Sequence, residues 1–455
     1  MTETAPHTRQ GTAVARIGGP GVTLSDEQVR AFVHEQLREV DLDGRSLCVL
    51  VSDGTRTCPL PLLLSALHGA VHGRVSRLTV LVALGTHPAM TEAALAMHLG
   101  YPEGGLRERY PDTAVRNHEW WDPATFVDLG TITADRIAEL SDGMLRQRVD
   151  VRINRAVVDH DLTVIVSPVF PHEVVGFSGG NKYLFPGVSG REPIDVSHWL
   201  GALITSARII GTRGVTPVRA LIDEAAAMVP GERLALCMVT GAGKARSEPE
   251  EIAPAKAAQT PADLPPAGET AVRLHAMTFG EPQAAWAAAA DVSAATHIRY
   301  LDAPVHRVLS ILPTRYDDLW TGAKGFYKVE PIVADGGQVV IYAPHIHEIS
   351  ATHPQIAEIG YHCRDYYVKQ WDRFCNYHWG DLAHSTHLRG AGTYDPEHGE
   401  DDRVTVTLAT GIPADQVRAV NLDYLDPASI DIGAWGADPD TLVVPDAGED
   451  LFRLR

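Results

Sequence analysis

The sequence predicts an α/β protein built from two α/β domains with mostly parallel sheets. Two observations support this fold class. Short apolar runs alternate with helical segments along the chain, and these runs are almost continuously apolar, as in strands covered on both faces. The length of 455 residues allows two or three domains. With 45% hydrophobic and 21% charged residues, the composition is that of a globular protein with ample core.

The first part of the chain, up to residue 300, contains three predicted strands and their helices. A capping box at Ser25 to Gln28 precedes apolar residues at helical spacing. The predicted strands are 46–52, 77–84 and 161–167, and the predicted helices are 29–37, 59–72, 91–99 and 196–208. This alternation is typical of βαβ units, whose strands are parallel.

A second series of strands and helices begins near residue 300, where we expect a domain boundary. The predicted strands are 307–312, 338–343, 404–408 and 441–444, and the predicted helices are 282–290 and 321–329. We therefore divide the chain into a first domain, 21–300, and a second, 301–455, whose last strand can return to the first. Residues 1–20 are predicted to be a disordered leader, and 241–269, rich in Ala, Pro, Glu and Gly, a surface loop.

Charge and cysteine content disfavour some classes of partner. The chain has 39 Lys and Arg against 58 Asp and Glu, a net charge of −19, and both nucleic acid and anionic membranes require a positive field. A few local cations can still attract an anionic substrate. The five cysteines lack CxxC spacing and suit reduced thiols, and no apolar run is long enough to span a bilayer. We therefore expect a cytoplasmic protein.

Three polar side chains come directly after predicted strands. Asp53, His87 and His172 each follow the carboxyl end of one strand. Ligands of open α/β sheets bind beyond these ends, so the three side chains are expected to converge although they lie far apart in the sequence. Each also has a simpler interpretation, because an Asp can cap a helix and a lone His is more often a satisfied structural residue.

The neighbours of these residues suggest anion binding and a covalent group. Thr55 and Arg56 lie on the first of the three turns, and a guanidinium binds a phosphate or a carboxylate through its planar fork. Residues 171–182 join His172 to a Gly-rich turn that ends in Lys182, where a phosphate or a covalent cofactor can be held. The alternative is an ordinary strand-to-loop junction with a surface lysine.

The remaining histidines and lysines are weaker candidates. His198 begins an apolar helix, and one neutral imidazole suits nickel or zinc but needs further ligands. Lys324 could bind a carboxylate, although a lysine on a helix is usually solvated. Seven C-terminal histidines have no HExxH or CxxC context, and we expect most of them to be surface or interface residues: His345, His347, His353, His362, His378, His384 and His387.

Taken together, these segments resemble the lactate racemase (LarA-type) family over roughly residues 45–345. The blocks that carry the resemblance occur in order and with matching internal spacing. They are Asp53-Gly-Thr55-Arg56, Gly85-Thr86-His87-Pro-Ala-Met-Thr91, Asn117-His118, Pro171-His172, Gly176-Phe-Ser-Gly-Gly-Asn-Lys182 and Phe185-Pro-Gly187.

The resemblance implies a racemase or epimerase of 2-hydroxy acids with its active site in the interdomain cleft. Its cofactor would be a nickel-pincer nucleotide, a pyridinium mononucleotide with sulfur arms, attached covalently to Lys182 and accepting hydride from the substrate. It also implies partner proteins that make the cofactor, and it allows a homo-oligomer. The implied site residues are His87 and His172 as acid/base residues, His198 as nickel ligand, Asp53, Thr55, Ser178, Gly179, Gly180 and Lys182 at the cofactor, and Arg56, Thr321 and Lys324 at the substrate.

The chain departs from the family pattern at several positions. Thr321 stands where a glutamine is expected, Pro313 to Arg315 replaces a small Gly-containing turn, and Asn181 stands where a basic residue is common. Residues 365–400, rich in aromatic residues and histidine, do not align. These differences concern the substrate more than the cofactor, and a larger or more polar acid than lactate is at least as well supported.

Two other classes of function stay open. A nicotinamide-type 2-hydroxy acid dehydrogenase needs a GxGxxG turn that opens a helix, and no such turn follows 46–52, 77–84 or 161–167. A non-catalytic nickel or nucleotide-binding protein would keep Lys182 and His198 but would have no use for two acid/base histidines.

Overall fold

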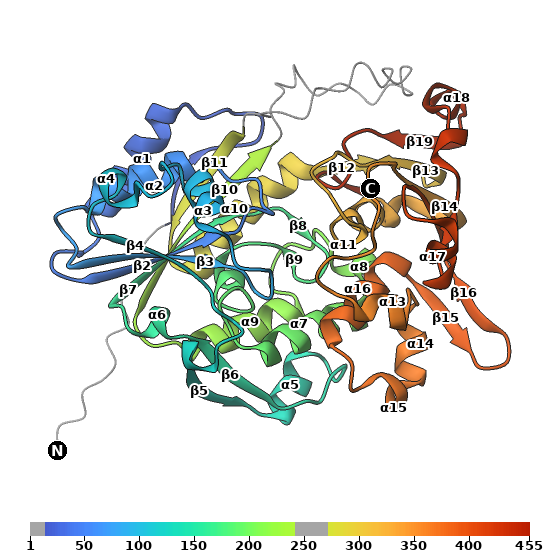
Figure 1. Ribbon diagram of the computed structural model, residues 1–455, viewed down its shortest axis with the longest axis horizontal. Coiled ribbons are helices and arrows are strands. Elements are labelled where there is room, and N and C mark those ends of the chain that lie inside the picture. Colours follow the sequence, from blue (N-terminus) through green and yellow to red (C-terminus); the bar gives the residue numbers. More distant parts are fainter. Residues whose placement is uncertain (1–13, 242–271) are drawn as a thin grey trace.

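The computed structural model describes residues 14–241 and 272–455, which form two sheets with helices between and around them (Figure 1). The first sheet has the strand order β1 (Ala15–Gly18), β11 (Arg273–Gly280), β10 (Glu232–Gly241), β7 (Leu162–Pro168), β2 (Ser46–Ser52), β3 (Arg77–Ala83) and β4 (Thr113–Asn117). Its neighbouring strands are parallel except at β11, which runs opposite to both β1 and β10.

The second sheet is parallel throughout, in the order β18 (Asp423–Tyr424), β17 (Val404–Thr410), β14 (Val333–Ala343), β13 (Val305–Ile311) and β19 (Thr441–Val444). The other described strands form two-stranded pairs: β5 (Phe126–Ile132) with β6 (Val149–Asn154), β8 (Pro171–His172) with β9 (Gly176–Phe177), β12 (Ile298–Leu301) with β20 (Leu451–Leu454), and β15 (Gly392–Asp395) with β16 (Gly399–Asp402). The fold class predicted from the sequence is confirmed.

Helices connect the strands of both sheets. In the first half they are α1 (Asp26–Arg38), α2 (Leu60–Val71), α3 (Glu92–Leu99), α4 (Leu106–Arg109), α5 (Ala134–Leu140), α6 (Arg155–Val158), α7 (Arg191–Ile204), α8 (Ser206–Ile209), α9 (Pro217–Ala227) and α10 (Pro282–His297). In the second half they are α11 (Leu319–Gly322), α12 (Lys324–Tyr327), α13 (Gln355–Ile359), α14 (Arg364–Lys369), α15 (Trp371–Phe374), α16 (Trp379–Arg389), α17 (Ala414–Ala419) and α18 (Ile432–Ala437).

The predicted strands agree closely with the observed ones. β2 and β19 have the predicted bounds, and β14 begins earlier than expected, at Val333. The capping box at the start of α1 is present, with the Ser25 hydroxyl accepting from Gln28 N and the Gln28 side chain accepting from Ser25 N. Local apolar pattern and capping chemistry therefore decide these elements without help from distant contacts.

Two predicted helices are interrupted. The helix expected over 196–208 begins at Arg191 and ends at Ile204, because Thr205 has a φ of 81°, outside the helical region. The helix expected over 321–329 consists of the short turns α11 and α12. These interruptions shape the site, since both segments contribute side chains to the cavity described below.

Part of the predicted leader is a strand. Ala15–Gly18 form β1, which pairs with β11 so that Ile17 lies opposite Met277, and the prediction of disorder is wrong for these residues. Residues 1–13 lie outside the described residues, as does the predicted loop after Gly241, which ends β10. Among the described residues, no helix is long and apolar enough to cross a membrane.

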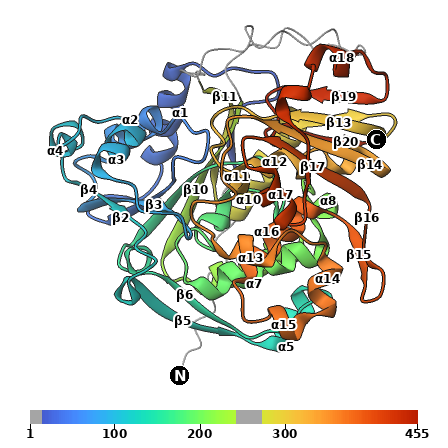
Figure 2. The ribbon, with the colours of Figure 1, turned by 45° about the vertical axis from the view of Figure 1, so that its right-hand side comes forward.

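The two halves of the chain are packed together by α7 and α16, which lie side by side in both ribbon views (Figures 1 and 2). Trp199 on α7 stacks on Trp371 with ring centroids 5.2 Å apart and meets Tyr367 edge-on at 6.4 Å. Near residue 300, β12 pairs with the C-terminal strand β20, and Arg453 Nη1 donates to Ile210 O at 2.6 Å. The division of the chain at that point stays a proposal.

Candidate active site

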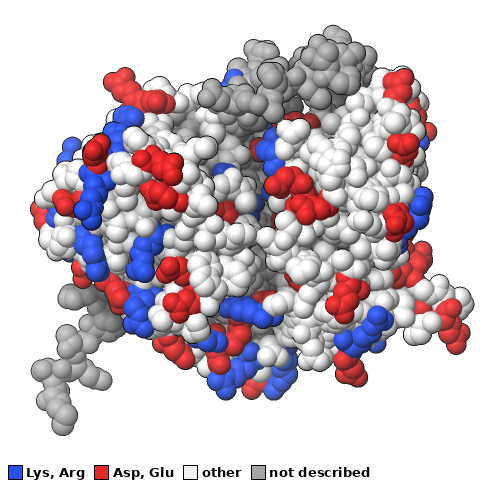
Figure 3. Space-filling view, in the orientation of Figure 1, with Lys and Arg blue, Asp and Glu red and all other residues white. Residues whose placement is uncertain are grey.

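A cavity of about 210 Å³ lies where the ends of β2, β3 and β7 meet side chains from the second half of the chain. The space-filling view shows this face hollowed along its middle, with acidic side chains spread over both sides (Figure 3). Among the sequence-predicted site residues, those that line the cavity are Asp53, Thr55, Arg56, His87, His172, Ser178, Lys182, His198, Thr321 and Lys324. Residues far apart in the sequence therefore meet at the carboxyl edge of the sheet, as expected.

Asp53 and His87 are joined by a hydrogen bond between Asp53 Oδ2 and His87 Nδ1. Neighbouring strands bring them together, because Ser52 at the end of β2 lies opposite Ala83 at the end of β3. The other carboxylate oxygen accepts from Thr55 N at 3.2 Å and from Thr55 Oγ1 at 2.6 Å. Burial raises the pKa of Asp53, but the hydrogen bond and charge of His87, with Arg56 and Thr55, outweigh it and leave the pKa below its usual value.

This arrangement fixes which nitrogen of His87 is free. Since an ionised carboxylate only accepts, Nδ1 carries the proton and Nε2 keeps a lone pair. The backbone of His87 is also held, because its N–H donates to Leu84 O and its carbonyl accepts from Trp120 Nε1, both at 2.9 Å. His87 is thus a positioned proton acceptor at Nε2.

His172 on β8 carries its proton on the other ring nitrogen, Nε2. Its side chain is buried, and Nδ1 accepts a hydrogen bond from Val174 N at 3.1 Å. A neutral ring with an accepting Nδ1 carries its proton on Nε2. Burial lowers the pKa of His172, and the nearby charges of Lys182 and Arg56 lower it further, so the ring is neutral at pH 7. One cavity therefore contains an imidazole acceptor and an imidazole donor.

Lys182 lies at the end of the Gly-rich turn and lines the same cavity. Burial lowers its pKa to about 7, and the charge of Arg56 acts in the same direction. Within the part of the chain that the structure describes, its ammonium group makes no hydrogen bond or ion pair. A buried amine that is partly neutral near pH 7 is a nucleophile suited to covalent attachment.

The glycines of this turn shape it rather than line the cavity. Gly179 and Gly180 have φ values of 82° and 59°, and a Cβ on Gly180 would lie 2.9 Å from Trp286. Gly180 N donates to Ser167 Oγ at 3.1 Å, so this N–H is not available to a ligand. Neither glycine lines the cavity, and their contact with the cofactor stays a prediction. Ser178 lines the cavity, but its hydroxyl is already bonded to Pro168 O and Phe170 N.

His198 projects from α7 into the cavity. Its Nδ1 donates to Ile194 O at 2.7 Å, one helical turn earlier, which leaves the lone pair on Nε2. This is the tautomer that a metal ligand requires. The sequence prediction of one imidazole ligand is compatible with this geometry.

Two cationic side chains of the cavity have no carboxylate partner among the described residues, although the chain is strongly acidic. Arg56 lies 5.5 Å above the ring of Phe170, and among the described residues no carboxylate pairs with it. Lys324 Nζ lies 4.8 Å from the ring of Tyr316, and burial lowers its pKa to about 7, with Arg56 contributing. Two such groups can bind one carboxylate.

Three further residues singled out in the sequence make hydrogen bonds within the chain. Thr321 lines the cavity, but its hydroxyl donates to Oδ1 of Asp318, the N-cap of α11, at 2.8 Å. Asn117 binds the backbone of Met90, at 3.1 Å to N and 2.9 Å to O. His118 is fully buried against Ser189 O and the Asn154 amide and does not reach the cavity.

Sequence reasoning missed one wall of the cavity. Glu173 lines the cavity, and its Oε2 lies 3.4 Å from His172 Nδ1. The second half of the chain adds Trp320, His353, His384 and His387. We expected most of the seven C-terminal histidines to be surface or interface residues. His353, His384 and His387 instead line the cavity, and His387 is buried. The available signal was the spacing of His384 and His387, which places both on one face of a helix.

Comparisons with known proteins relate this chain to lactate racemases. The sequence profile of the family described as "Lactate racemase N-terminal domain" matches residues 27–210. Lactate racemase of Thermoanaerobacterium thermosaccharolyticum is 24% identical over 199 residues, 42% of this chain and 42% of that protein. Lactate racemase of Lactiplantibacillus plantarum is 25% identical over 168 residues, 36% and 35% of the two chains. The matches thus span less than half the length of these curated relatives.

Two solved structures are similar over almost the whole chain. A protein from Thermotoga maritima has a TM-score of 0.80 and 30% identity, covering 96% of this chain and 100% of its own. The lactate racemase apoprotein from Thermoanaerobacterium thermosaccharolyticum has a TM-score of 0.68 and 17% identity, covering 95% and 93%. The second likeness shows a shared fold.

Proposed function

Since this chain belongs to the lactate racemase (LarA-type) family, we propose that it is a racemase or epimerase that inverts the α-carbon of a 2-hydroxy acid. The observation that carries the proposal is the pairing in one cavity of His87, which accepts at Nε2, with His172, which donates at Nε2. Two such groups can take a proton from a substrate oxygen and return one to it.

The proposed cofactor is a nickel-pincer nucleotide, and two residues fit it on independent grounds. Lys182 offers a buried amine that no described residue pairs, with a pKa lowered by burial to about 7. His198 offers a free Nε2 for nickel. When bound, the cofactor would accept the hydride from Cα of the substrate and return it. This removes the need to form a carbanion beside a carboxylate.

The side chains of this protein then handle the protons. His87 would take the hydroxyl proton at Nε2, and Asp53 would stabilise the imidazolium through Nδ1–H. His172 would donate a proton to the oxygen when the opposite face reacts, acting as an imidazolium whose Nδ1 lies 3.4 Å from Glu173 Oε2, and it would return to the neutral ring. The histidine that first accepts becomes the donor in the reverse direction, as inversion in both directions requires.

The substrate carboxylate is proposed to lie between Arg56 and Lys324. Both face the cavity and both lack a carboxylate partner among residues 14–241 and 272–455. A bidentate guanidinium fixes the orientation of a carboxylate, and the lysine adds charge. The wall from the second half of the chain reduces the contact of the reacting atoms with bulk water, which strengthens each of these interactions.

The test is nickel analysis and intact mass of protein isolated from cells that also contain the cofactor-making proteins, our proposed partners in the cytoplasm. We expect bound nickel, a mass increase at Lys182 and inversion of at least one acid in a chiral screen of 2-hydroxy acids. Lys182→Ala should lose all three. Nickel with the mass increase but without turnover of any acid would indicate a carrier. Turnover that depends on added nicotinamide cofactor would indicate a dehydrogenase. Full activity of Lys182→Ala would refute the proposal.

A further inference from the structure

The second half of the chain supplies a cavity surface that we call the imidazole wall, made of Trp320, His353, His384 and His387. Trp320 lies between two imidazoles, stacked on His353 at 3.7 Å and on His384 at 3.8 Å between ring centroids. The acid/base and cofactor roles proposed above use none of these side chains. Their chemistry therefore bears on the part of the substrate beyond its reacting carbon.

Hydrogen bonds fix the free nitrogen on two of the rings. His384 Nε2 donates to Trp320 O at 2.9 Å, so Nδ1 is an acceptor, and no described residue donates to it. His353 Nδ1 binds Asp381 Oδ1 at 2.9 Å, which leaves Nε2 as an acceptor. The wall thus presents lone pairs rather than protons at these two positions.

His387 is the least satisfied polar group of the wall. It is 4% exposed, and neither ring nitrogen has a partner among the described residues. Burial lowers the pKa of His387 to about 4 and that of His384 to about 3, so both rings are neutral at pH 7. A neutral imidazole offers one donor and one acceptor, which is the complement of a hydroxyl group. Leaving both unpaired in a buried position is unfavourable, so a ligand that pairs them gains affinity.

Glu173 adds a charged acceptor to the same cavity. Burial raises the pKa of Glu173, but the nearby charges of His387 in its protonated form, Arg56 and Lys328 outweigh this effect and keep the pKa below its usual value. An ionised carboxylate accepts hydrogen bonds from hydroxyl groups and repels a second carboxylate. The charge on Glu173 therefore disfavours a dicarboxylic substrate at this end of the cavity.

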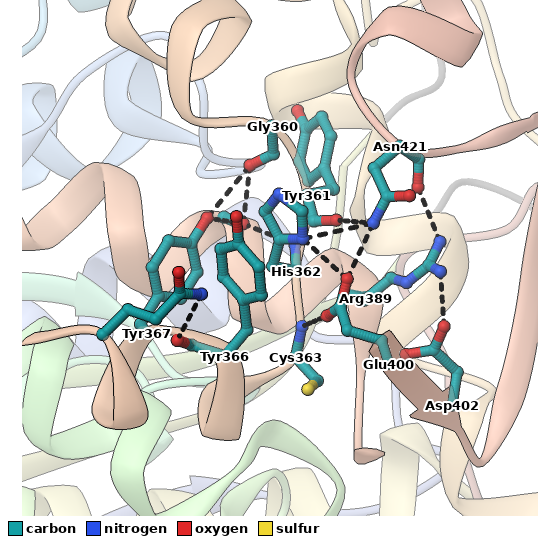
Figure 4. A network of polar contacts seen from close by, with 12 residues as sticks. Gly360, Tyr361, His362, Cys363, Tyr366, Tyr367, Arg389, Glu400, Asp402 and Asn421 are labelled. Atoms are coloured by element: carbon teal, nitrogen blue, oxygen red, sulfur yellow. Dashed lines mark hydrogen bonds and ion pairs between the residues drawn. The ribbon is translucent and has the colours of Figure 1, made fainter. Parts of the chain in front are cut away.

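Hydrogen bonds from two residues of α16 tie this helix, which carries His384 and His387, to its surroundings, and Figure 4 shows the network that Arg389 joins. Ser385 Oγ donates to Gly360 O at 2.8 Å and bonds to Tyr367 OH at 2.6 Å. At the end of α16, Arg389 donates to Asn421 O at 2.6 Å and also binds Asp402. Ser385, between the two histidines, and Arg389, after them, thus anchor this part of α16, as positioned recognition groups require.

We propose that the imidazole wall, with His387 as its main polar group, and Glu173 form a subsite for hydroxyl groups. The preferred substrate is then a 2-hydroxy acid with at least one further hydroxyl group. An alkyl chain would leave the buried nitrogens unpaired, and a second carboxylate would meet acceptors and a negative charge. This inference rests on the proposed function, since Arg56 and Lys324 must hold the first carboxylate for the chain to reach the wall.

The first test compares glycerate, lactate and malate, which differ only in a hydroxymethyl, methyl or carboxymethyl group. With nickel-loaded enzyme, kcat/KM for inversion of glycerate should exceed those for lactate and malate by at least about 10-fold, the effect of one net hydrogen bond. Isothermal titration of the same protein should show the same order of affinity. Equal kcat/KM for glycerate and lactate would overturn the subsite and leave the proposed function standing. No inversion of any acid by nickel-loaded enzyme would instead refute the proposed function.

The second test assigns the preference to the wall. His387→Leu keeps the volume and removes both nitrogens, so the ratio of kcat/KM for glycerate to that for lactate should fall toward one, mainly through KM. His306→Leu, at an exposed position on β13, is the matched control and should keep the parent ratio. If His387→Leu does not fold, His387→Asn, which keeps one donor and one acceptor, should retain part of the preference. An unchanged ratio in a folded His387 variant would contradict the inference.

Discussion

The carboxylate of Asp53 and the Nδ1 nitrogen of His87 are hydrogen-bonded across the ends of two neighbouring parallel strands. The same carboxylate is held on its other oxygen by Thr55. His87 cannot rotate without breaking this contact, so its Nε2 keeps a lone pair aimed away from Asp53. His172, whose Nδ1 accepts from Val174 N, has the opposite tautomer. Backbone and carboxylate contacts of this kind thus assign different proton roles to two chemically identical side chains.

Asp53→Asn should reduce turnover while leaving substrate binding largely intact. The amide can still contact Nδ1, but it cannot stabilise the imidazolium, and kcat should fall by about 10²–10⁴-fold with little change in KM. Steady-state kinetics with glycerate or lactate measure this. Asp41→Asn, at an exposed position, should behave like the parent. A kcat of Asp53→Asn within a factor of two of the parent would exclude an orienting role.

His87→Asn and His172→Asn should each lower inversion in both directions. Each variant lacks one of the two proton carriers, and the loss of general acid/base assistance is worth about 10²–10⁴-fold in rate. Nickel content and the mass increase at Lys182 should stay at parent levels, because neither histidine attaches the cofactor. Loss of nickel in either variant would mean that the histidine serves the metal site, which contradicts the assignment.

Lys182 should react with amine reagents at an unusually low pH. With its pKa at about 7, about half of the amine is neutral at pH 7, whereas an ordinary lysine is almost fully charged. Carbamylation of the apoprotein by cyanate, followed by peptide mass mapping, should show modification at Lys182 with a midpoint near pH 7. Exposed Lys369 is the internal control, because its contact with Asp365 raises its pKa. A midpoint for Lys182 above pH 9 would contradict the electrostatic argument.

Lys182→Met should stabilise the apoprotein at neutral pH, with an advantage that shrinks as the pH rises. The folded state lowers the pKa of this amine, so between its folded pKa near 7 and the unfolded value the unfolded chain binds more protons. The free energy of unfolding of the parent therefore rises with pH in this window. At pH 7 the free energy of unfolding of the variant should exceed that of the parent by roughly 4 kcal/mol, and near pH 10 the two should be close. Thermal melts across this range measure it, with Lys369→Met as control. A constant offset between Lys182→Met and the parent would contradict the linkage.

Much of the fold follows from local sequence. β2 and β19 were predicted with their observed bounds, since a continuous apolar run between turn residues has few alternatives in an α/β protein. β1 was missed because four residues without a strong apolar pattern become a strand only by pairing with β11, far along the chain. The break at Thr205 was missed for a similar reason, since no local sequence rule requires a positive φ there.

The candidate site likewise contains residues that the sequence could group and residues whose role it could not decide. Asp53, His87 and His172 could be grouped from the sequence because the carboxyl ends of parallel strands meet at one edge. The role of Gly179 and Gly180 could not be decided from the sequence, because a Gly-rich turn can present its N–H groups to a ligand or, as Gly180 does, to its own chain.

By itself, the sequence determined the alternation of strands and helices, the strand-end residues and the motif around Lys182, because each depends on residues close together in the chain. The tertiary structure decided which nitrogen of each histidine carries the proton and which side chains complete the cavity. Both depend on partners from distant segments, such as Asp53 for His87 and Trp320 for His384. A hydrogen bond or a shared cavity wall between such segments exists only after the chain has folded, so no local sequence pattern predicts it.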